Sequence, residues 1–366
     1  MKYICIKVKS EKRKVKNLLP QSFIGRWHSV AVAIFSLFTL SAILLTACVK
    51  EDTYDNSRRG NFEALWKAMD EHYCFFSYKR QQLGVDWDEV HTRYASQVNE
   101  DMNSTQLFEV LCNMIAELQD GHVNLSSPFD YGRNWSFFED HPENYNDSIA
   151  RLYLGHNYQI ASGLKYIILD DNIGYVRCET FEDGIGDGNV SVMLNSLALC
   201  NGLIIDVRGN GGGQLTKAQT LASHFTNERR LIGYISHKTG KGRNDFSTPD
   251  AQYLDPASDG VRWQKPVVVL TNRAVFSAAN DFVKCMKQCP NVTIMGDQTG
   301  GGSGMPFNSE LPNGWTVRYS AVVLYDRDMQ HTEFGIAPDI QLSMSGADLA
   351  QHKDTYIEAA RKFLVE

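Results

Sequence analysis

Short runs of consecutive apolar residues that alternate with helix-like segments are the feature that most constrains the fold of this 366-residue chain. The run at 267–270, Val-Val-Val-Leu, is typical of a strand buried on both faces. The other strand-like segments are 166–169, 173–177, 203–208, 231–237, 292–295 and 315–324, and helical patterns cover 189–200, 215–225 and 354–364. Because strands that alternate with helices form largely parallel sheets, we predict an α/β core over residues 164–366. Its site is expected at the carboxyl ends of the strands.

The segment from Lys265 to Asp281 contains a strand, a tight turn and, from about Ala278, a helix. Ser277 stands where the turn enters the helix. There its hydroxyl could simply cap the helix, since serine is among the preferred N-cap residues. It could instead be presented beyond the sheet as a nucleophile, with free helix N–H groups beside it to stabilise an oxyanion. This stretch alone leaves both interpretations open.

The region before the α/β core has a helical pattern. Apolar residues recur at three- and four-residue steps along 62–73, 87–98 and 107–118, which predicts a small three-helix domain over residues 61–127. A glycine stops its last helix and His122 follows at once. Such a histidine on its own is ordinarily a solvated or capping residue. Residues 128–163 have no period, and we predict an irregular connection over the surface.

The first 47 residues have the pattern of an export signal. A basic stretch precedes the uncharged run 30–47, which ends in Leu-Thr-Ala-Cys at 45–48. This ending resembles the bacterial lipobox, which implies cleavage before Cys48 and lipidation of that cysteine. A permanent transmembrane anchor is the alternative, because 18 residues lie at the lower length limit for a span. Either reading places the remainder outside the cytoplasm.

From this we predict a signal peptide over residues 1–47, a polar tether over 48–60, and a protein lipid-anchored in a bacterial membrane. The acidic start of the tether favours the outer membrane of the cell envelope, on the periplasmic or the surface side. Removal of residues 1–47 leaves 28 of the 36 basic and 42 of the 43 acidic residues, a net charge of −14. This balance argues against nucleic acid as a partner.

The cysteines do not indicate a metal site. Besides Cys5 and Cys48 they lie at 74, 112, 178, 200, 285 and 289, with no CxxC pair and no His/Cys cluster of the zinc type. Most of them fall within apolar helix or strand patterns. We therefore expect buried thiols in preference to disulfides, and no metal.

Five segments with chemical content occur in a definite order. They are Asp-Gly-His at 120–122, Asp-Val-Arg-Gly-Asn-Gly-Gly-Gly at 206–213, Thr-Asn-Arg-Ala-Val-Phe-Ser-Ala-Ala-Asn at 271–280, Gly-Asp-Gln-Thr-Gly-Gly-Gly at 296–302 and Gly-Ile-Ala-Pro-Asp-Ile at 335–340. Together they resemble the S41 family of serine peptidases, which includes the C-terminal processing proteases and the tricorn core protease. The resemblance runs from about Phe62 to the end. It implies a crotonase-like core of ββα units preceded by the helical domain.

The two branches of that family differ in their chemistry. The processing branch uses a serine–lysine dyad, but its lysine position holds Gly302 here, which excludes that dyad. The tricorn-like branch uses serine, histidine and glutamate. This implies Ser277 as nucleophile, His122 as its base and Glu333 as the carboxylate that orients the imidazole. The serine that completes a tetrad in that branch is Gly121 in this chain.

The resemblance also implies an oxyanion hole made by the Ala278 N–H and a backbone N–H of Gly211 or Gly212. The expected function is a serine endopeptidase that hydrolyses peptides or unfolded protein segments without a cofactor. The alternative is a catalytically silent crotonase-like binding protein for an apolar or peptide ligand. Acyl-CoA chemistry, a third option for this fold, is disfavoured by the predicted location outside the cytoplasm. Residues 126–162 are too few for the PDZ-like insert usual in processing proteases.

Overall fold

The computed structural model describes residues 54–133, 135, 139, 141–182 and 184–366. The predicted signal peptide, the lipidation site Cys48 and the first part of the tether therefore lie outside the described residues. The helices are α2 (Arg58–His72), α3 (Phe76–Leu83), α4 (Trp87–Ala95), α5 (Ser104–Ala116), α7 (Asp147–Leu154), α8 (Asp187–Ser196), α9 (Leu215–Ser223), α10 (Ala278–Met286), α11 (Gly346–Ala350) and α12 (Thr355–Val365). Within the described ranges, no helix has the length and apolar character needed to cross a membrane.

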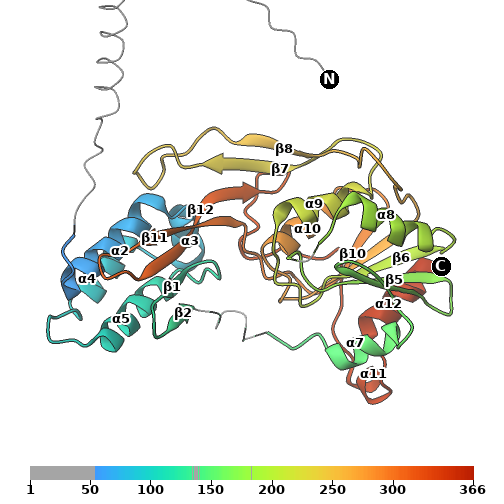
Figure 1. The fold of residues 1–366 in the computed structure, drawn as a ribbon, viewed down its shortest axis with the longest axis horizontal. Coiled ribbons are helices and arrows are strands. Elements are labelled where there is room, and N and C mark those ends of the chain that lie inside the picture. Colours follow the sequence, from blue (N-terminus) through green and yellow to red (C-terminus); the bar gives the residue numbers. More distant parts are fainter. Residues whose placement is uncertain (1–53, 134, 136–138, 140, 183) are drawn as a thin grey trace, which may run out of the picture. The chain divides into compact units, whose positions relative to one another are not determined.

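The strands form two sheets (Figure 1). They are β1 (Asn124–Ser126), β2 (Tyr131–Arg133), β3 (Gln159–Ala161), β4 (Leu164–Ile168), β5 (Ile173–Cys178), β6 (Gly202–Asp206), β7 (Arg230–His237), β8 (Asp250–Leu254), β9 (Val267–Thr271), β10 (Val292–Gly296), β11 (Gly304–Glu310), β12 (Thr316–Tyr325) and β13 (Ile340–Gln341). The mixed α/β architecture agrees with the predicted fold class.

The first sheet has the order β13-β10-β9-β6-β5-β4-β3, parallel from β13 to β5 and antiparallel at β4 and β3. Along β6, Leu203 and Ile205 pack into a core shared with α8, α9 and α10. Ile204, on the opposite face, packs into a second core shared with α7 and α12. Because side chains alternate along a strand, this arrangement confirms the prediction of strands buried on both faces.

The second sheet is antiparallel, with the order β2-β1-β12-β7-β8 and with β11 paired to β12. Its strands β1 and β12 share one apolar core with helices α2 to α5, in which Leu65 and Leu111 lie together with Val317. The helices therefore do not bury their apolar faces against one another alone. The predicted boundaries at residues 60, 127 and 163 stay predictions.

Two short helices in the part of the chain before the α/β core were not indicated by the sequence pattern. The region predicted to hold three helices also contains α3, and the region 128–163, predicted to be irregular, contains β2, α7 and β3. Both α3 and α7 have 8 residues, about two turns, which is too short for a period to stand out.

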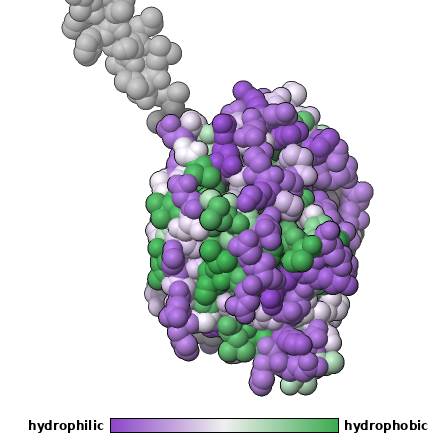
Figure 2. All heavy atoms as spheres, turned by 90° about the vertical axis from the view of Figure 1, so that its right-hand side faces the viewer, coloured by the Kyte–Doolittle hydropathy of each residue, from purple (hydrophilic) through white to green (hydrophobic). Residues whose placement is uncertain are grey.

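Figure 2 shows the side of the molecule on which α12 lies, where apolar patches alternate with hydrophilic ones.

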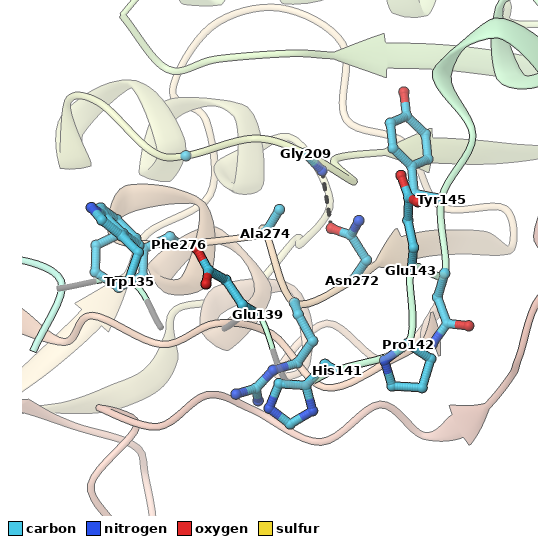
Figure 3. A pocket seen from close by; sticks show the side chains of 13 residues that line it. Trp135, Glu139, His141, Pro142, Glu143, Tyr145, Gly209, Asn272, Ala274 and Phe276 are labelled. Atoms are coloured by element: carbon cyan, nitrogen blue, oxygen red, sulfur yellow. Dashed lines mark hydrogen bonds between the residues drawn. The ribbon is translucent and has the colours of Figure 1, made fainter. Parts of the chain in front are cut away.

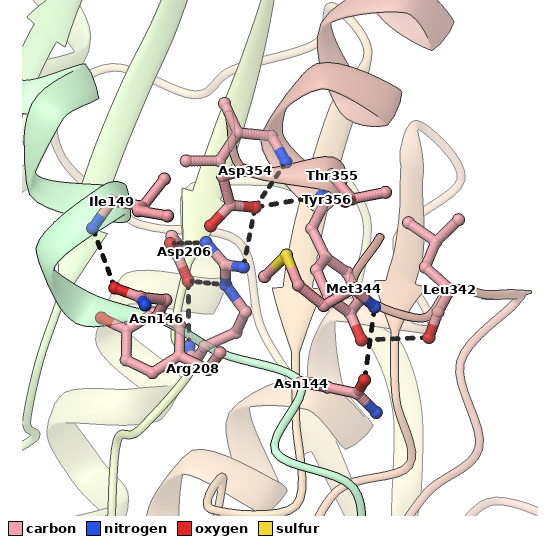
Figure 4. A network of polar contacts seen from close by, with 12 residues as sticks. Asn144, Asn146, Ile149, Asp206, Arg208, Leu342, Met344, Asp354, Thr355 and Tyr356 are labelled. Carbon is pink, nitrogen blue, oxygen red and sulfur yellow. Dashed lines mark hydrogen bonds and ion pairs between the residues drawn. The ribbon is translucent and has the colours of Figure 1, made fainter. Parts of the chain in front are cut away.

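A buried charged network joins Asp206 and Arg208, which directly precede the glycine-rich loop, to the start of α12 (Figure 4). The Arg208 guanidinium donates to Asp206 Oδ2 at 2.7 Å and to Asp354 Oδ1, in the N-cap of α12, at 3.0 Å. All three side chains are fully buried. Burial alone would raise the pKa of Asp206, but Arg208 and Arg177 lower it to about 2. The network ties the start of the loop at 209–213 to the last helix.

Candidate active site

Ser277 occupies the turn between β9 and α10 in a strained conformation. Its φ is 57° and its ψ −122°, and its side chain makes no capping hydrogen bond to the helix. The capping interpretation of this serine is therefore wrong. A non-glycine residue with positive φ costs free energy and persists only where the surroundings over-determine it. Here the Ser277 N–H donates to the Gly301 carbonyl at 2.8 Å.

Glycines let two neighbouring loops approach this turn. A Cβ on Gly212, whose φ is 106°, would lie 2.8 Å from the Ser277 Cβ and from the Phe276 carbonyl oxygen. A Cβ on Gly302 would lie 2.3 Å from the Phe276 ring. A lysine could not occupy position 302 without displacing that ring. This gives a steric reason why the serine–lysine dyad is absent from this position.

His122 contacts Ser277 from the turn that leads into β1, a strand of the antiparallel sheet. Its Nε2 lies 3.0 Å from Ser277 Oγ, although 155 positions separate the two residues. The His122 ring also packs against Phe276, with 4.8 Å between the ring centroids. The histidine lies in the turn between α5 and β1, and its side chain is only 4% exposed. The structure thus brings together two of the three residues implied as the catalytic group.

A buried carboxylate, Asp120, fixes the histidine turn. Its Oδ1 accepts the His122 backbone N–H at 2.8 Å, and its Oδ2 accepts the hydroxyls of Tyr73 and Ser320 at 3.1 and 2.9 Å. Burial lowers the pKa of His122 to about 4; Asp120 opposes this shift, whereas Arg318 adds to it. A neutral imidazole at physiological pH is the form that can accept a proton.

Glu333 does not hydrogen-bond His122 among the described residues. Its Oε1 pairs with the Lys79 ammonium at 3.1 Å, and its Oε2 accepts the Ser303 N–H at 2.9 Å. Lys79, which is fully buried, also donates to the Gln119 carbonyl at 3.2 Å, three residues before the histidine. Burial raises the pKa of Glu333, and the nearby Asp120 carboxylate raises it further. Lys79 opposes this shift. In place of the expected contact with the imidazole, Glu333 pairs with Lys79, which bonds the Gln119 carbonyl near the histidine turn.

Sequence reasoning missed Lys79, Tyr73 and Ser320, because nothing in their local pattern distinguishes them from other helix or strand residues. Asp120 belongs to the Asp-Gly-His segment and could have been singled out by that position. The unpaired Nδ1 of His122 is buried without a hydrogen-bond partner in the described part of the chain.

The three predicted oxyanion donors are not equivalent. The Gly212 N–H donates to Asn210 Oδ1 at 2.9 Å, so it is already engaged. Among the hydrogen bonds of the described residues, none uses the N–H of Gly211 or Ala278. Ala278 is the first residue of α10, where backbone N–H groups have no partner within the helix. The pair Gly211 and Ala278 can therefore serve as donors, and Gly212 contributes by having no side chain.

Two cavities open at the site. The first, the Trp135 pocket, has a volume of about 490 Å³ and is lined by Trp135, Tyr145, Gly211, Arg273 and Phe276 among others. Figure 3 shows Phe276 beside Trp135, with 5.3 Å between the ring centroids, and the bond from the Gly209 N–H to Asn272. The second, the Ser277 pocket, has a volume of about 340 Å³ and is lined by Ser277, Gly302, Ser303 and Arg318 among others. Together they offer room for a peptide at the serine.

Other candidate chemistry is sparse in the described residues. They contain no group of three or more His, Cys, Asp or Glu side chains that could hold a metal ion. No disulfide joins the cysteines of this part of the chain, and five of those six cysteines are buried. Burial raises the pKa of the Cys285 thiol, which disfavours a reactive thiolate there.

Comparisons with known proteins identify the families and folds that this chain resembles. The family model described as peptidase family S41 matches residues 172–342, and the model of the tricorn protease C1 domain matches residues 54–116. A solved structure of a candidate peptidase from Parabacteroides merdae is 51% identical, covers 85% of this chain and 98% of its own, and has a TM-score of 0.81. Mature CPAF in complex with lactacystin, at 12% identity and a TM-score of 0.65, shares the fold over 84% of this chain and 98% of its own.

Curated relatives match a shorter stretch. The carboxy-terminal processing protease CtpA of Bacillus subtilis is 25% identical over 179 residues, which are 48% of this chain and 36% of that protein. The carboxy-terminal-processing protease of Bartonella bacilliformis is 27% identical over 186 residues, 48% of this chain and 40% of that protein. The chain thus spans well under half the length of these relatives.

Proposed function

Since this chain belongs to peptidase family S41, a family of serine-type peptidases, we propose that it is an endopeptidase that cleaves peptides or unfolded protein segments. The proposed catalytic residues are Ser277 and His122, with Glu333 in support. The observation that carries the proposal is the 3.0 Å separation of His122 Nε2 and Ser277 Oγ. A serine hydroxyl is a weak nucleophile until a base within hydrogen-bond reach takes its proton.

In the proposed reaction, His122 Nε2 takes the proton of Ser277 as its Oγ attacks the carbonyl carbon of the scissile peptide bond. The carbonyl oxygen becomes an oxyanion, which the N–H groups of Gly211 and Ala278 stabilise. His122 then passes the proton to the leaving nitrogen, the C–N bond breaks, and an acyl-enzyme ester remains. A water deprotonated by His122 attacks the ester, releases the carboxylic acid and restores the Ser277 hydroxyl.

Glu333 supports the histidine indirectly in this proposal. Its ion pair with Lys79 and the Lys79 bond to the Gln119 carbonyl form a chain that ends next to the turn holding His122. Its bond to the Ser303 N–H holds the loop that packs on the serine turn. Glu333 is therefore a positioning residue, which holds the base side and the nucleophile side in register.

Labelling with a fluorophosphonate probe tests the proposed function. The purified protein should label and should hydrolyse an unfolded protein substrate, and Ser277→Ala should lose both activities while it keeps its fold, because a partly exposed hydroxyl contributes little to packing. Ser96→Ala, which removes an exposed hydroxyl at the end of α4, is the matched control. A folded wild-type protein that neither labels nor cleaves would instead be a silent binding protein for an apolar or peptide ligand.

The proposed location is the bacterial cell envelope, with a lipid anchor at Cys48 in the outer membrane. The lipobox-like ending at 45–48 supports it. The mature protein should partition into the detergent phase, and Cys48→Ala should abolish that partitioning, because the lipid chains supply the membrane affinity. Retention of the Cys48→Ala protein in membranes would identify the run 30–47 as a transmembrane anchor.

A further inference from the structure

Arg318 lies on the face of β12 that is turned towards His122, the proposed catalytic base. Its neighbours Val317 and Tyr319 pack into the core shared with the helices. Because side chains alternate along a strand, Arg318 lies on the opposite face, together with Ser320. The Ser320 hydroxyl donates to Asp120, the carboxylate that holds the His122 turn. The sequence motifs did not single out this arginine.

Arg318 lines the Ser277 pocket, and its guanidinium has no hydrogen-bond or ion-pair partner in the part of the chain that the structure describes. The charged side chains that line this pocket are Arg318 and Asp281. Asp281 is buried, is paired with the Lys284 ammonium and accepts a hydrogen bond from Gln219. By contrast, no hydrogen bond or ion pair of the Arg318 guanidinium occurs among the described residues. The charge of the pocket is therefore positive, in a protein whose formal net charge is −7.

The charge of Arg318 lies in the same cavity as the proposed nucleophile. Ser277 lines the same cavity of about 340 Å³. Arg318 contributes to the lowered pKa of His122, which is consistent with a cation close to the imidazole. Ser303, whose hydroxyl is buried and has no hydrogen-bond partner in the described part of the chain, adds a second polar group to the pocket wall.

We infer that Arg318 selects peptides that carry a carboxylate next to the scissile bond, an inference that rests on the proposed peptidase function. A guanidinium offers a planar set of donors that matches a carboxylate and can bind it bidentately. An unpaired cation in a partly enclosed pocket is stabilised by an anionic ligand that replaces lost hydration. The carboxylate comes either from an aspartate or glutamate side chain or from the free C-terminus of the peptide.

Two pairs of fluorogenic peptides test this preference. In one pair glutamate replaces glutamine beside the scissile bond, and in the other a free C-terminal acid replaces the amide. We expect kcat/KM to be about 10- to 100-fold higher for the carboxylate form in one pair, the range of a charge-assisted hydrogen bond. A preference in the first pair identifies a side-chain carboxylate as the group recognised, and a preference in the second identifies the C-terminus.

Variants assign the preference to the arginine. In Arg318→Gln the ratio of kcat/KM within the preferred pair should fall towards one, and Arg318→Lys should retain part of it because the charge remains. Arg327→Gln removes the same charge from an exposed position outside the pocket and should keep the full ratio. Equal cleavage within both pairs, or a preference that survives Arg318→Gln, would overturn the inference and leave the peptidase function standing.

Failure of the proposed function can be distinguished from failure of this inference. If the wild-type protein neither labels with the fluorophosphonate probe nor cleaves any peptide, the peptidase proposal fails. Fluorescence anisotropy with the same labelled peptides then measures binding alone. A binding preference for the carboxylate peptide that is lost in Arg318→Gln still supports carboxylate recognition by Arg318, whereas equal binding within both pairs overturns it.

Discussion

Ser277 and His122 lie 3.0 Å apart, but they are held in different ways. Ser277 is held mainly by backbone: a positive φ, a bond to the Gly301 carbonyl, and Gly212 packed directly beside it. His122 is held by buried side chains that come from distant segments, through Asp120 and the Lys79–Glu333 pair. The nucleophile side depends on local conformation, and the base side depends on long-range polar packing. Substitutions on the nucleophile side and on the base side should therefore have different effects on the protein.

The largest effect is expected where the two sides meet. His122→Ala removes the proposed base and should lower turnover by roughly 10³- to 10⁶-fold, as removal of a triad member does. The double variant with Ser277→Ala should lose no more than the worse single variant, because the two residues act as one unit. Steady-state kinetics together with a melting curve measure this. Near-normal turnover in a folded His122→Ala protein would mean that another group serves as the base.

On the base side, Lys79→Met should destabilise the whole protein. The change leaves the buried Glu333 without its partner, and breaking a buried ion pair costs about 3–5 kcal/mol. Adding Glu333→Gln should recover part of this loss, because no charge then remains buried. Lys287→Met breaks the more exposed pair with Asp339 and should cost less than about 1 kcal/mol.

Denaturant unfolding measures these free energies. If Lys79→Met costs no more than Lys287→Met, buried polar packing is not what holds the base side, and the contrast between the two sides disappears.

On the nucleophile side, Gly212→Ala should cost less, about 1–3 kcal/mol of backbone strain, because L residues disfavour its φ of 106°. The added Cβ would also press on Ser277, so the rate of probe labelling should fall as well. Gly211→Ala is the matched control, since a Cβ there meets nothing within 4 Å and the φ is not positive. Equal unfolding free energies for the two variants would show that Gly212 is not required by the serine turn.

This contrast also explains how much the sequence could reveal. The strand at 267–270, the helix from Ala278 and the glycine run at 209–213 are local patterns, so the elements of the nucleophile side were predictable, whereas the role of Ser277 was implied by a resemblance. The base side was not predictable from local patterns. His122 was implied by a resemblance, and Lys79 and Ser320 lie 43 positions before it and 198 positions after it. A buried lysine or serine on a helix or strand gives no periodic signal, so only the three-dimensional packing reveals its partner.

Glu333 illustrates the same limit. The motif that follows it was sufficient to single out the residue, and its burial near the site agrees with a role there. Its partner could not be predicted, because a carboxylate in a low-dielectric interior pairs with whichever cation the fold brings closest, which here is Lys79 from α3. The sequence pattern did not predict helix α3 either, because that helix is too short to show a period.

The most direct test of the central claim, that burial keeps His122 neutral as the base of Ser277, is the pH dependence of kcat/KM. The substrate should carry no group that titrates between about pH 3 and pH 8. Only the neutral imidazole accepts the serine proton, so activity should fall as the pH drops through the pKa of the free enzyme's base. With that pKa lowered to about 4, activity should persist through pH 6 and decline only near pH 4. A decline centred near the ordinary histidine value of about 6.5 would contradict the account.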